Sequence, residues 1–242
     1  MKSVWPPPKE IPNDLRSQYT LNDLISVRSY FLMERQNGGK GYFWPGSYLD
    51  EFGKKNCTCG PYNSPDCHHV ITTYSHFIAN KKGYVFGSQT PWAEAALIAA
   101  GASRVTTVEY MRINTTHPTL TTVHPSDLAE AFLVGSVEPL DFAWSYSSFE
   151  HDGLGRYGDP LNPFGDLESI ARVQCLLKKD GILFLALPVG NDAIEWNAHR
   201  IYGPLRLGLI LSNWMLLDVI GANHHGFKKG LNHPILVLRK FD

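Results

Sequence analysis

The sequence predicts a doubly wound α/β domain with a mostly parallel sheet, preceded by an N-terminal arm. From Lys82 onward, short apolar runs typical of strands alternate with segments of helical periodicity, as expected for a sheet with helices on both faces. The first predicted strand ends at Gly87, and the second ends near an acidic residue, Glu109. Residues 1–80 lack this alternation. We therefore divide the chain into an arm with a Cys-rich loop over residues 1–80 and an α/β domain over residues 81–242.

Within the arm, the sequence predicts one helix, over Leu21–Glu34. An Asn–Asp pair stands near its start, and apolar residues follow at helical spacing. The loop beyond it contains Cys57, Cys59 and Cys67, followed by two histidines. A C-x-C spacing is too tight for the usual zinc knuckle. Three states stay open for these cysteines: a structural metal site, a disulfide in an oxidising compartment, or free thiols.

The first half of the α/β domain contains three predicted strands and two helices. Buried or β-branched runs predict the strands, and alanine-rich or amphipathic stretches predict the helices. Gly101 is expected to end the first helix. In chain order, these elements are a strand at Gly83–Gly87, a helix at Pro91–Ala100, a strand at Arg104–Tyr110, a weak strand at Thr121–His124 and a short helix at Asp127–Leu133.

The second half repeats the alternation and then departs from it. The last two strands follow one another without a long helix between them, which favours one antiparallel strand at an edge of the sheet. Cys175 falls inside a predicted helix, where we expect it to be buried. The predicted elements are a strand at Leu140–Tyr146, a helix at Phe164–Lys179, a strand at Ile182–Leu187, a helix at Ala198–Leu211, and strands at Trp214–Ile220 and Ile235–Leu238.

The turn after the first strand has the character of a cofactor-binding loop. Glycine at position 87 lets the backbone approach a ligand closely, and the next helix begins directly after the Ser88–Gln89 turn. The unpaired N–H groups of that helix point towards the same place. Glu109 lies at the tip of the second strand, where a carboxylate can bond ribose hydroxyls.

This layout resembles the class I S-adenosylmethionine-dependent methyltransferases. The segments that carry the resemblance are the Gly87 loop with Glu109, the run DFAWSYSSFEH at residues 141–151, and IARVQCLLKKDGILFLALPVG at residues 170–190. The run WNAHRIYG at residues 196–203 is similar to a methyltransferase-like family of unknown function first described from Caenorhabditis. The resemblance implies a Rossmann-like methyltransferase fold and S-adenosylmethionine as cofactor. It implies cofactor contacts from Gly87, Ser88, Gln89, Glu109, Asp127 and Ser147, with Asp127 near the adenine.

The loop departs from the family pattern at two positions. Gln89 and Pro91 stand where the family usually has further glycines. A larger side chain there would narrow the cofactor site, so a non-catalytic binding module on the same fold stays open as an alternative. A nucleotide-sugar or dinucleotide enzyme is a further alternative, although a G-x-G-x-x-G motif is absent from the sequence.

Acidic residues and a histidine follow the strand at Leu140–Tyr146. Because ligands of doubly wound sheets bind at the carboxyl ends of strands, Glu150 and His151 are expected to face the cavity. Methylation of a hydroxyl needs a base, and histidine suits that role. We predict His151 as this base, Glu150 beside it, and His199 as the second candidate. The alternative is that His151 lines the cofactor site without moving a proton.

A second polar cluster follows the next strand. Asn191, Asp192, Asn197 and Arg200 lie on the same predicted edge of the sheet. Amide and carboxylate groups bond hydroxyls, and arginine binds anions. We predict that these four residues bind the acceptor, against the alternative of a polar loop that starts a helix.

The composition of the chain limits the classes of partner and the compartment that we expect. The net charge is −1, and no dense block of lysine and arginine is present, so a nucleic-acid partner is not expected. We expect a small-molecule or glycan substrate. No apolar stretch is long enough for a membrane span, and the first residues do not resemble a signal peptide, which favours the cytoplasm. Sequons at Asn56 and Asn114 leave a secretory lumen open as the alternative, although such triplets also arise by chance.

Overall fold

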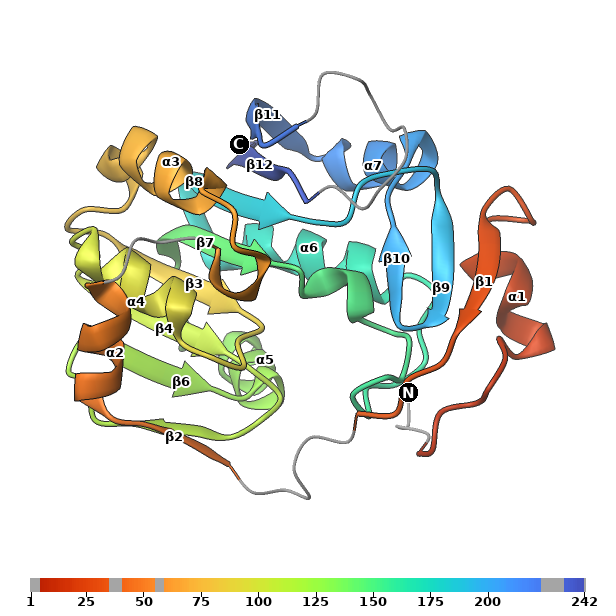
Figure 1. The fold of residues 1–242 in the computed structure, drawn as a ribbon, viewed down its shortest axis with the longest axis horizontal. Coiled ribbons are helices and arrows are strands. Elements are labelled where there is room, and N and C mark those ends of the chain that lie inside the picture. The colour runs from red at the N-terminus through yellow and green to blue at the C-terminus, as the bar shows by residue number, and fades with distance from the viewer. Residues whose placement is uncertain (1–4, 35–40, 55–58, 223–232, 242) are drawn as a thin grey trace.

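The computed structural model describes residues 5–34, 41–54, 59–222 and 233–241. Its centre is a seven-stranded sheet in the order β11-β12-β8-β7-β3-β4-β6 (Figure 1). The strands from β8 to β6 are parallel to one another, while β12 runs antiparallel to both of its neighbours. The strands are β3 (Lys82–Phe86), β4 (Arg104–Val108), β6 (Leu120–Val123), β7 (Leu140–Tyr146), β8 (Leu177–Ala186), β11 (Trp214–Ile220) and β12 (Ile235–Lys240).

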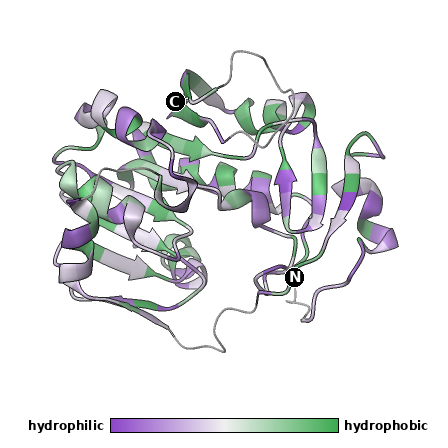
Figure 2. Ribbon diagram, in the orientation of Figure 1, coloured by the Kyte–Doolittle hydropathy of each residue, from purple (hydrophilic) through white to green (hydrophobic). Residues whose placement is uncertain are grey.

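The sheet separates two apolar cores, as strand periodicity requires. Along β7, Phe142 and Trp144 belong to the core on one face, and Ala143 belongs to the core on the other. One face is covered by α3 (Asp66–Thr73) and α4 (Trp92–Ala99), with α2 (Gly46–Gly53) packed on α4. The other face is covered by α5 (Pro125–Leu133), α6 (Gly165–Leu176) and α7 (Pro204–Leu211). In Figure 2 the strands between these layers carry green, hydrophobic segments that alternate with paler ones.

Segments of the arm add strands at opposite ends of the molecule (Figure 1). After α1 (Asn13–Tyr19), β1 (Ser26–Tyr30) pairs in parallel with β9 (Ala193–Asn197), which also pairs with β10 (His199–Ile201). At the other end, β2 (Tyr42–Trp44) pairs with β5 (Ile113–Thr115). The short 3-10 helices are η2 (Gly60–Tyr62), η3 (Ser75–Phe77) and η4 (Phe149–His151).

Two of the predicted helices are wrong. In place of the helix at Leu21–Glu34, the chain makes a left-handed turn, with positive φ at Leu21, Asn22 and Asp23, and then forms β1. The Asn–Asp pair near the predicted start tolerates this conformation. In place of a helix over the whole of Ala198–Leu211, β10 occupies the first part and α7 begins at Pro204. In both places strand pairing with β9 overrides local helix propensity.

Two smaller expectations are also corrected. The antiparallel strand, β12, lies between β8 and β11 and is not at the edge. Cys175 is exposed on α6 because it lies on the side of the helix that faces away from the core formed with Ile170 and Val173.

A disulfide joins Cys59 to Cys67, with the two Cα atoms 5.2 Å apart. Both residues are fully buried. Cys57 and the Asn56 sequon lie outside the described residues, whereas Asn114 is exposed on β5. Within the described residues, no group of histidine, cysteine and acidic side chains is placed to hold a metal ion. The helices described here are also too short or too polar to cross a membrane.

Candidate functional site

A cavity of about 1330 Å³ lies at the carboxyl ends of the parallel strands, the edge at which doubly wound sheets bind ligands. Its walls come from the ends of β3, β4 and β7, from α4, α5 and α6, and from η2 of the arm. Eight of the predicted site residues line it: Gly87, Ser88, Gln89, Glu109, Ser147, Glu150, His151 and His199. The cavity therefore joins the predicted cofactor loop to the predicted base.

Gly87 makes the turn after β3. Its φ is +73°, which favours glycine, and its N–H donates to the Val108 carbonyl over 3.1 Å. A Cβ built on Gly87 would lie 2.0 Å from Ser148 Oγ. Glycine is thus needed both for the turn and for the close packing of this turn against the segment after β7.

Glu109 holds the backbone of the same turn. The Ser88 N–H donates to Glu109 Oε2 over 2.8 Å, and the Met111 N–H donates to Oε1 over 3.3 Å. The residue is 9% exposed and lines the cavity. A carboxylate has about four acceptor positions, so Glu109 can accept further hydrogen bonds from ribose hydroxyls. The residues at this end therefore fit the ribose of a nucleoside cofactor.

The wall beside Glu109 is apolar and suits a purine ring. Leu128 and Phe132 of α5 line it, together with the side chain of Tyr110. Asp127, predicted near the adenine, is exposed on the first turn of α5 and accepts a hydrogen bond from Ser126 Oγ. It is not among the described residues that line the cavity, because its side chain lies on the solvent side of that helix.

The other end of the cavity holds Ser147, Glu150 and His151. Ser147 has a φ of +53°, and its hydroxyl donates to Glu150 Oε1. Glu150 is fully buried, and its Oε2 atom has no hydrogen-bond partner in the described part of the chain. His151 Nε2 lies 3.5 Å from Glu150 Oε1, and His151 Nδ1 lies 2.6 Å from the Ala198 carbonyl oxygen. The carbonyl contact leaves Nε2 as the nitrogen able to accept a proton.

Burial keeps this pair uncharged. Desolvation raises the pKa of Glu150 to about 8, so the carboxyl is protonated at neutral pH. Desolvation, followed by the nearby Arg156 guanidinium, lowers the pKa of His151 to about 3. The pKa of His199 is also lowered, again chiefly by burial. Its ring centroid lies 6.3 Å from that of His151.

The four residues predicted to bind the acceptor are placed elsewhere. Arg200 is fully buried and donates to the carbonyls of Glu150 and Asp152. Asp192 accepts from the N–H groups at the start of α7, and Asn197 accepts from the Leu32 N–H. Asn191 is exposed. Among the described residues these four do not line the cavity, because β9 and β10 turn this segment towards the arm.

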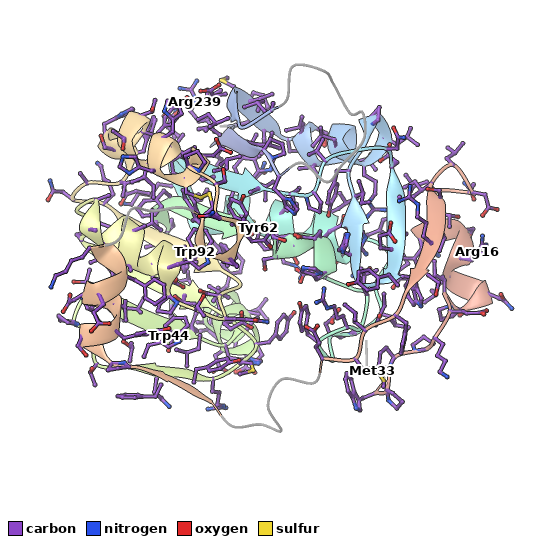
Figure 3. All side chains as sticks on the ribbon, viewed as in Figure 1. Arg16, Met33, Trp44, Tyr62, Trp92 and Arg239 are labelled. Carbon is purple, nitrogen blue, oxygen red and sulfur yellow. A yellow bond between two sulfur atoms is a disulfide. The ribbon has the colours of Figure 1, made fainter. Side chains whose placement is uncertain are left out.

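Aromatic side chains missed by sequence reasoning complete the cavity wall. The Tyr62 ring lies 4.8 Å from that of Tyr146 and 5.1 Å from that of His233. Trp92 packs edge-on against Tyr146 with centroids 5.6 Å apart, and Figure 3 shows Tyr62 and Trp92 near the middle of the molecule. Tyr62 comes from η2, Trp92 from α4 and Tyr146 from β7, and His233 lies just before β12. The Cys-rich spacing was the one local signal that the segment around Tyr62 is held in place.

The sequence matches the family described as "Caenorhabditis protein of unknown function, DUF268" over residues 80–229. No curated protein matches it. A putative S-adenosylmethionine-dependent methyltransferase from Listeria monocytogenes is 10% identical, with a TM-score of 0.51 over 73% of this chain and 99% of that one. TehB from Haemophilus influenzae is 14% identical, with a TM-score of 0.51 over 80% of this chain and 67% of that one.

A Burkholderia thailandensis 1,6-didemethyltoxoflavin-N1-methyltransferase, solved with S-adenosylhomocysteine, is 16% identical, with a TM-score of 0.48 over 81% of this chain and 84% of that one. At identities this low, the likeness to solved structures concerns the fold. The predicted doubly wound, mostly parallel fold of the methyltransferase type is confirmed.

Proposed function

This chain belongs to the DUF268 family, and we propose that it is an S-adenosylmethionine-dependent methyltransferase that methylates a hydroxyl of a small molecule or glycan. One observation carries the proposal: a single cavity connects the Gly87–Glu109 turn to the buried Glu150–His151 pair. The first end suits a nucleoside, and the second offers an uncharged imidazole next to a neutral carboxyl group. Solved methyltransferases of the same fold support the cofactor assignment.

Glu109 and the Gly87–Gln89 turn would hold the ribose and the amino-acid part of the cofactor. The bound cofactor supplies a methyl group on a positively charged sulfur. For the acceptor, the aromatic rings of Tyr62 and Tyr146 offer flat faces, which suit a sugar or another ring-shaped molecule better than an extended chain.

His151 would take the proton from the acceptor hydroxyl. The Ala198 carbonyl fixes the proton of His151 on Nδ1 and orients the ring, so Nε2 carries the lone pair. Glu150, held by Ser147, lies beside Nε2, and its Oε1 atom would accept the Nε2–H that forms when the imidazole takes the proton. His199, which also lines the cavity, is the second candidate base.

One observation favours a non-catalytic binding module as the alternative. Both oxygens of Glu109 already accept backbone N–H groups, and Gln89 projects from the same turn into the cavity lining. If these contacts are the whole role of Glu109, the turn is closed to a nucleoside. The discriminating property is cofactor binding.

Calorimetry with S-adenosylmethionine and S-adenosylhomocysteine tests the proposal. We expect micromolar binding, weakened by about 1–3 kcal/mol in Glu109→Ala through loss of charged hydrogen bonds. The matched control is Glu138→Ala, because Glu138 is exposed and pairs with Lys82 at the opposite edge of the sheet. If a folded sample binds neither ligand at millimolar concentration, the methyltransferase proposal is wrong. Binding of NAD or a UDP-sugar instead would favour a nucleotide-dependent enzyme.

A further inference from the structure

Beneath the cofactor turn lies a second carboxyl group, that of Glu94. It stands in the first turn of α4 and is fully buried. Thr107 Oγ1 donates to Glu94 Oε1 over 2.8 Å, and Ser88 Oγ lies 3.1 Å from Glu94 Oε2. Ser88 also donates its N–H to Glu109. One serine thus connects the buried Glu94 to Glu109, the residue assigned above to the ribose.

The hydrogen bonds of the Ser88 hydroxyl group indicate the protonation state of the Glu94 carboxyl group. Ser88 Oγ lies 3.0 Å from the Thr90 carbonyl oxygen as well as 3.1 Å from Glu94 Oε2. A serine hydroxyl has one hydrogen and cannot donate to both oxygens. Both contacts are satisfied when Glu94 is protonated: the carboxyl donates to Ser88 Oγ, and Ser88 donates to Thr90. An ionised Glu94 would compete with the Thr90 carbonyl for that hydrogen.

The electrostatic surroundings agree with a protonated carboxyl. Burial raises the pKa of Glu94 to about 7 and outweighs the hydrogen bonds from its own backbone, Thr107 and Ser88, which lower the pKa; the negative charge of Glu109 adds to the effect of burial. On the elements packed against α4, the titratable side chains of α2 and β4 are Tyr48, Asp50, Glu51 and Arg104, all exposed. In the described part of the chain, no cationic side chain forms an ion pair with Glu94 that would favour its ionised form.

We propose that Glu94 is a positioning residue whose protonated carboxyl holds the Ser88–Thr90 turn in the shape that binds the cofactor, so that cofactor affinity depends on this proton. The inference rests on the function proposed above. When Glu94 loses its proton, Ser88 turns its hydroxyl from Thr90 to Glu94 and the turn loses an internal hydrogen bond. The carboxylates of Glu94 and Glu109 then both accept a hydrogen bond from Ser88. The Ser88 N–H, which donates to Glu109, shifts as a result. Affinity falls as pH rises through the pKa of Glu94.

The test is the pH dependence of S-adenosylhomocysteine affinity, measured by calorimetry between pH 6 and pH 9. We expect the parent to lose about fivefold or more in affinity, a typical size for coupling between two linked sites. Glu94→Gln should lose clearly less affinity than the parent between pH 6 and pH 9, because its amide donates to Ser88 and accepts from Thr107 without titrating. Glu94→Ala should bind weakly at every pH.

Other groups in the cavity titrate as well, so the inference is tested by comparing the pH profile of Glu94→Gln with that of the parent. Glu94→Gln keeps Glu150, Asp152 and the ligand itself unchanged, and a parallel pH profile in the parent and Glu94→Gln would overturn the inference while leaving the proposed function intact. Absence of binding at pH 6 would overturn the proposed function instead. If Glu94→Gln does not fold, Ser88→Ala decides, because removing the shared hydroxyl should flatten the profile. A steep profile in Ser88→Ala contradicts the inference.

Discussion

Two buried polar clusters on the chain differ in charge and in what surrounds them. Asp166 lies between Arg206, at 2.6 and 2.8 Å, and the Tyr202 hydroxyl, at 3.0 Å. Burial raises its pKa, but Arg200 and Arg206 outweigh this effect and lower it. In the second cluster Glu150 bonds a serine, and its pKa is raised. The first cluster is therefore charged and the second is neutral.

The difference shows how a buried polar group that stabilises the fold can be distinguished from one that takes part in a reaction. Both oxygens of Asp166 are bonded, and the cluster joins α6 to α7 and, through Arg200, to β10, away from the cavity. Glu150 keeps an oxygen without a partner in the described chain, and its residue lines the cavity. Buried polar groups normally have partners. Among the described residues, nitrogens of Arg200 and Arg206 in the charged cluster also lack one, so it is the position beside a ligand-sized cavity that makes Glu150 the better candidate for chemistry.

The largest expected effect comes from breaking the charged cluster. Asp166→Ala leaves two buried guanidinium groups without their carboxylate, which should lower the free energy of unfolding by about 3–5 kcal/mol. Urea unfolding followed by fluorescence measures the loss. Asp50→Ala is the matched control, because Asp50 is exposed on α2 and only loosely paired with His117, at 3.8 Å. A loss below about 1 kcal/mol would mean that the cluster is not what holds α6 and α7 together.

Substitution in the neutral cluster should affect the reaction instead of the fold. His151→Gln is expected to slow methyl transfer by about 10²–10⁴-fold, the usual contribution of a general base. Affinity for S-adenosylhomocysteine should stay close to that of the parent. Single-turnover methylation of an acceptor found by screening measures the effect. His199→Gln is run beside it: a larger loss in that variant would assign the base to His199.

The same contrast explains what the sequence could predict. The Gly87–Glu109 end is built from one strand–turn–helix–strand unit, so its residues lie close in the chain and their spacing determines their geometry. Strands β3 and β4 and helix α4 could be predicted for the same reason. Glu94 was missed even there, because an acidic residue in a first helical turn is an ordinary surface feature, and only the packing of Thr107 and Ser88 reveals its burial.

The rest of the cavity depends on contacts between distant segments. Arg200 and Asp192 have the residue types of an acceptor site, but pairing of β9 with β1 and β10 directs them to carbonyls and to the start of α7. Tyr62 reaches the cavity through a disulfide-linked segment of the arm. No periodicity in the sequence encodes such long-range pairing, and the predicted helices at Leu21–Glu34 and Ala198–Leu211 failed for this reason.

The smallest expected effect tests whether Glu150 is buried in its neutral form. Its pKa is raised to about 8 in the folded chain, so between about pH 4.5 and pH 8 the folded state binds more protons than the unfolded state. The free energy of unfolding contributed by this residue therefore falls as pH rises through that window and levels off above it. Glu150→Gln cannot titrate, so from pH 5 to pH 8 it should lose on the order of 1–3 kcal/mol less stability than the parent.

Urea unfolding at both pH values measures the difference, and Glu168→Gln on the exposed face of α6 serves as control. Equal losses in Glu150→Gln and the parent would mean that Glu150 is ionised in the folded protein, and the contrast between the two clusters would then be one of location alone.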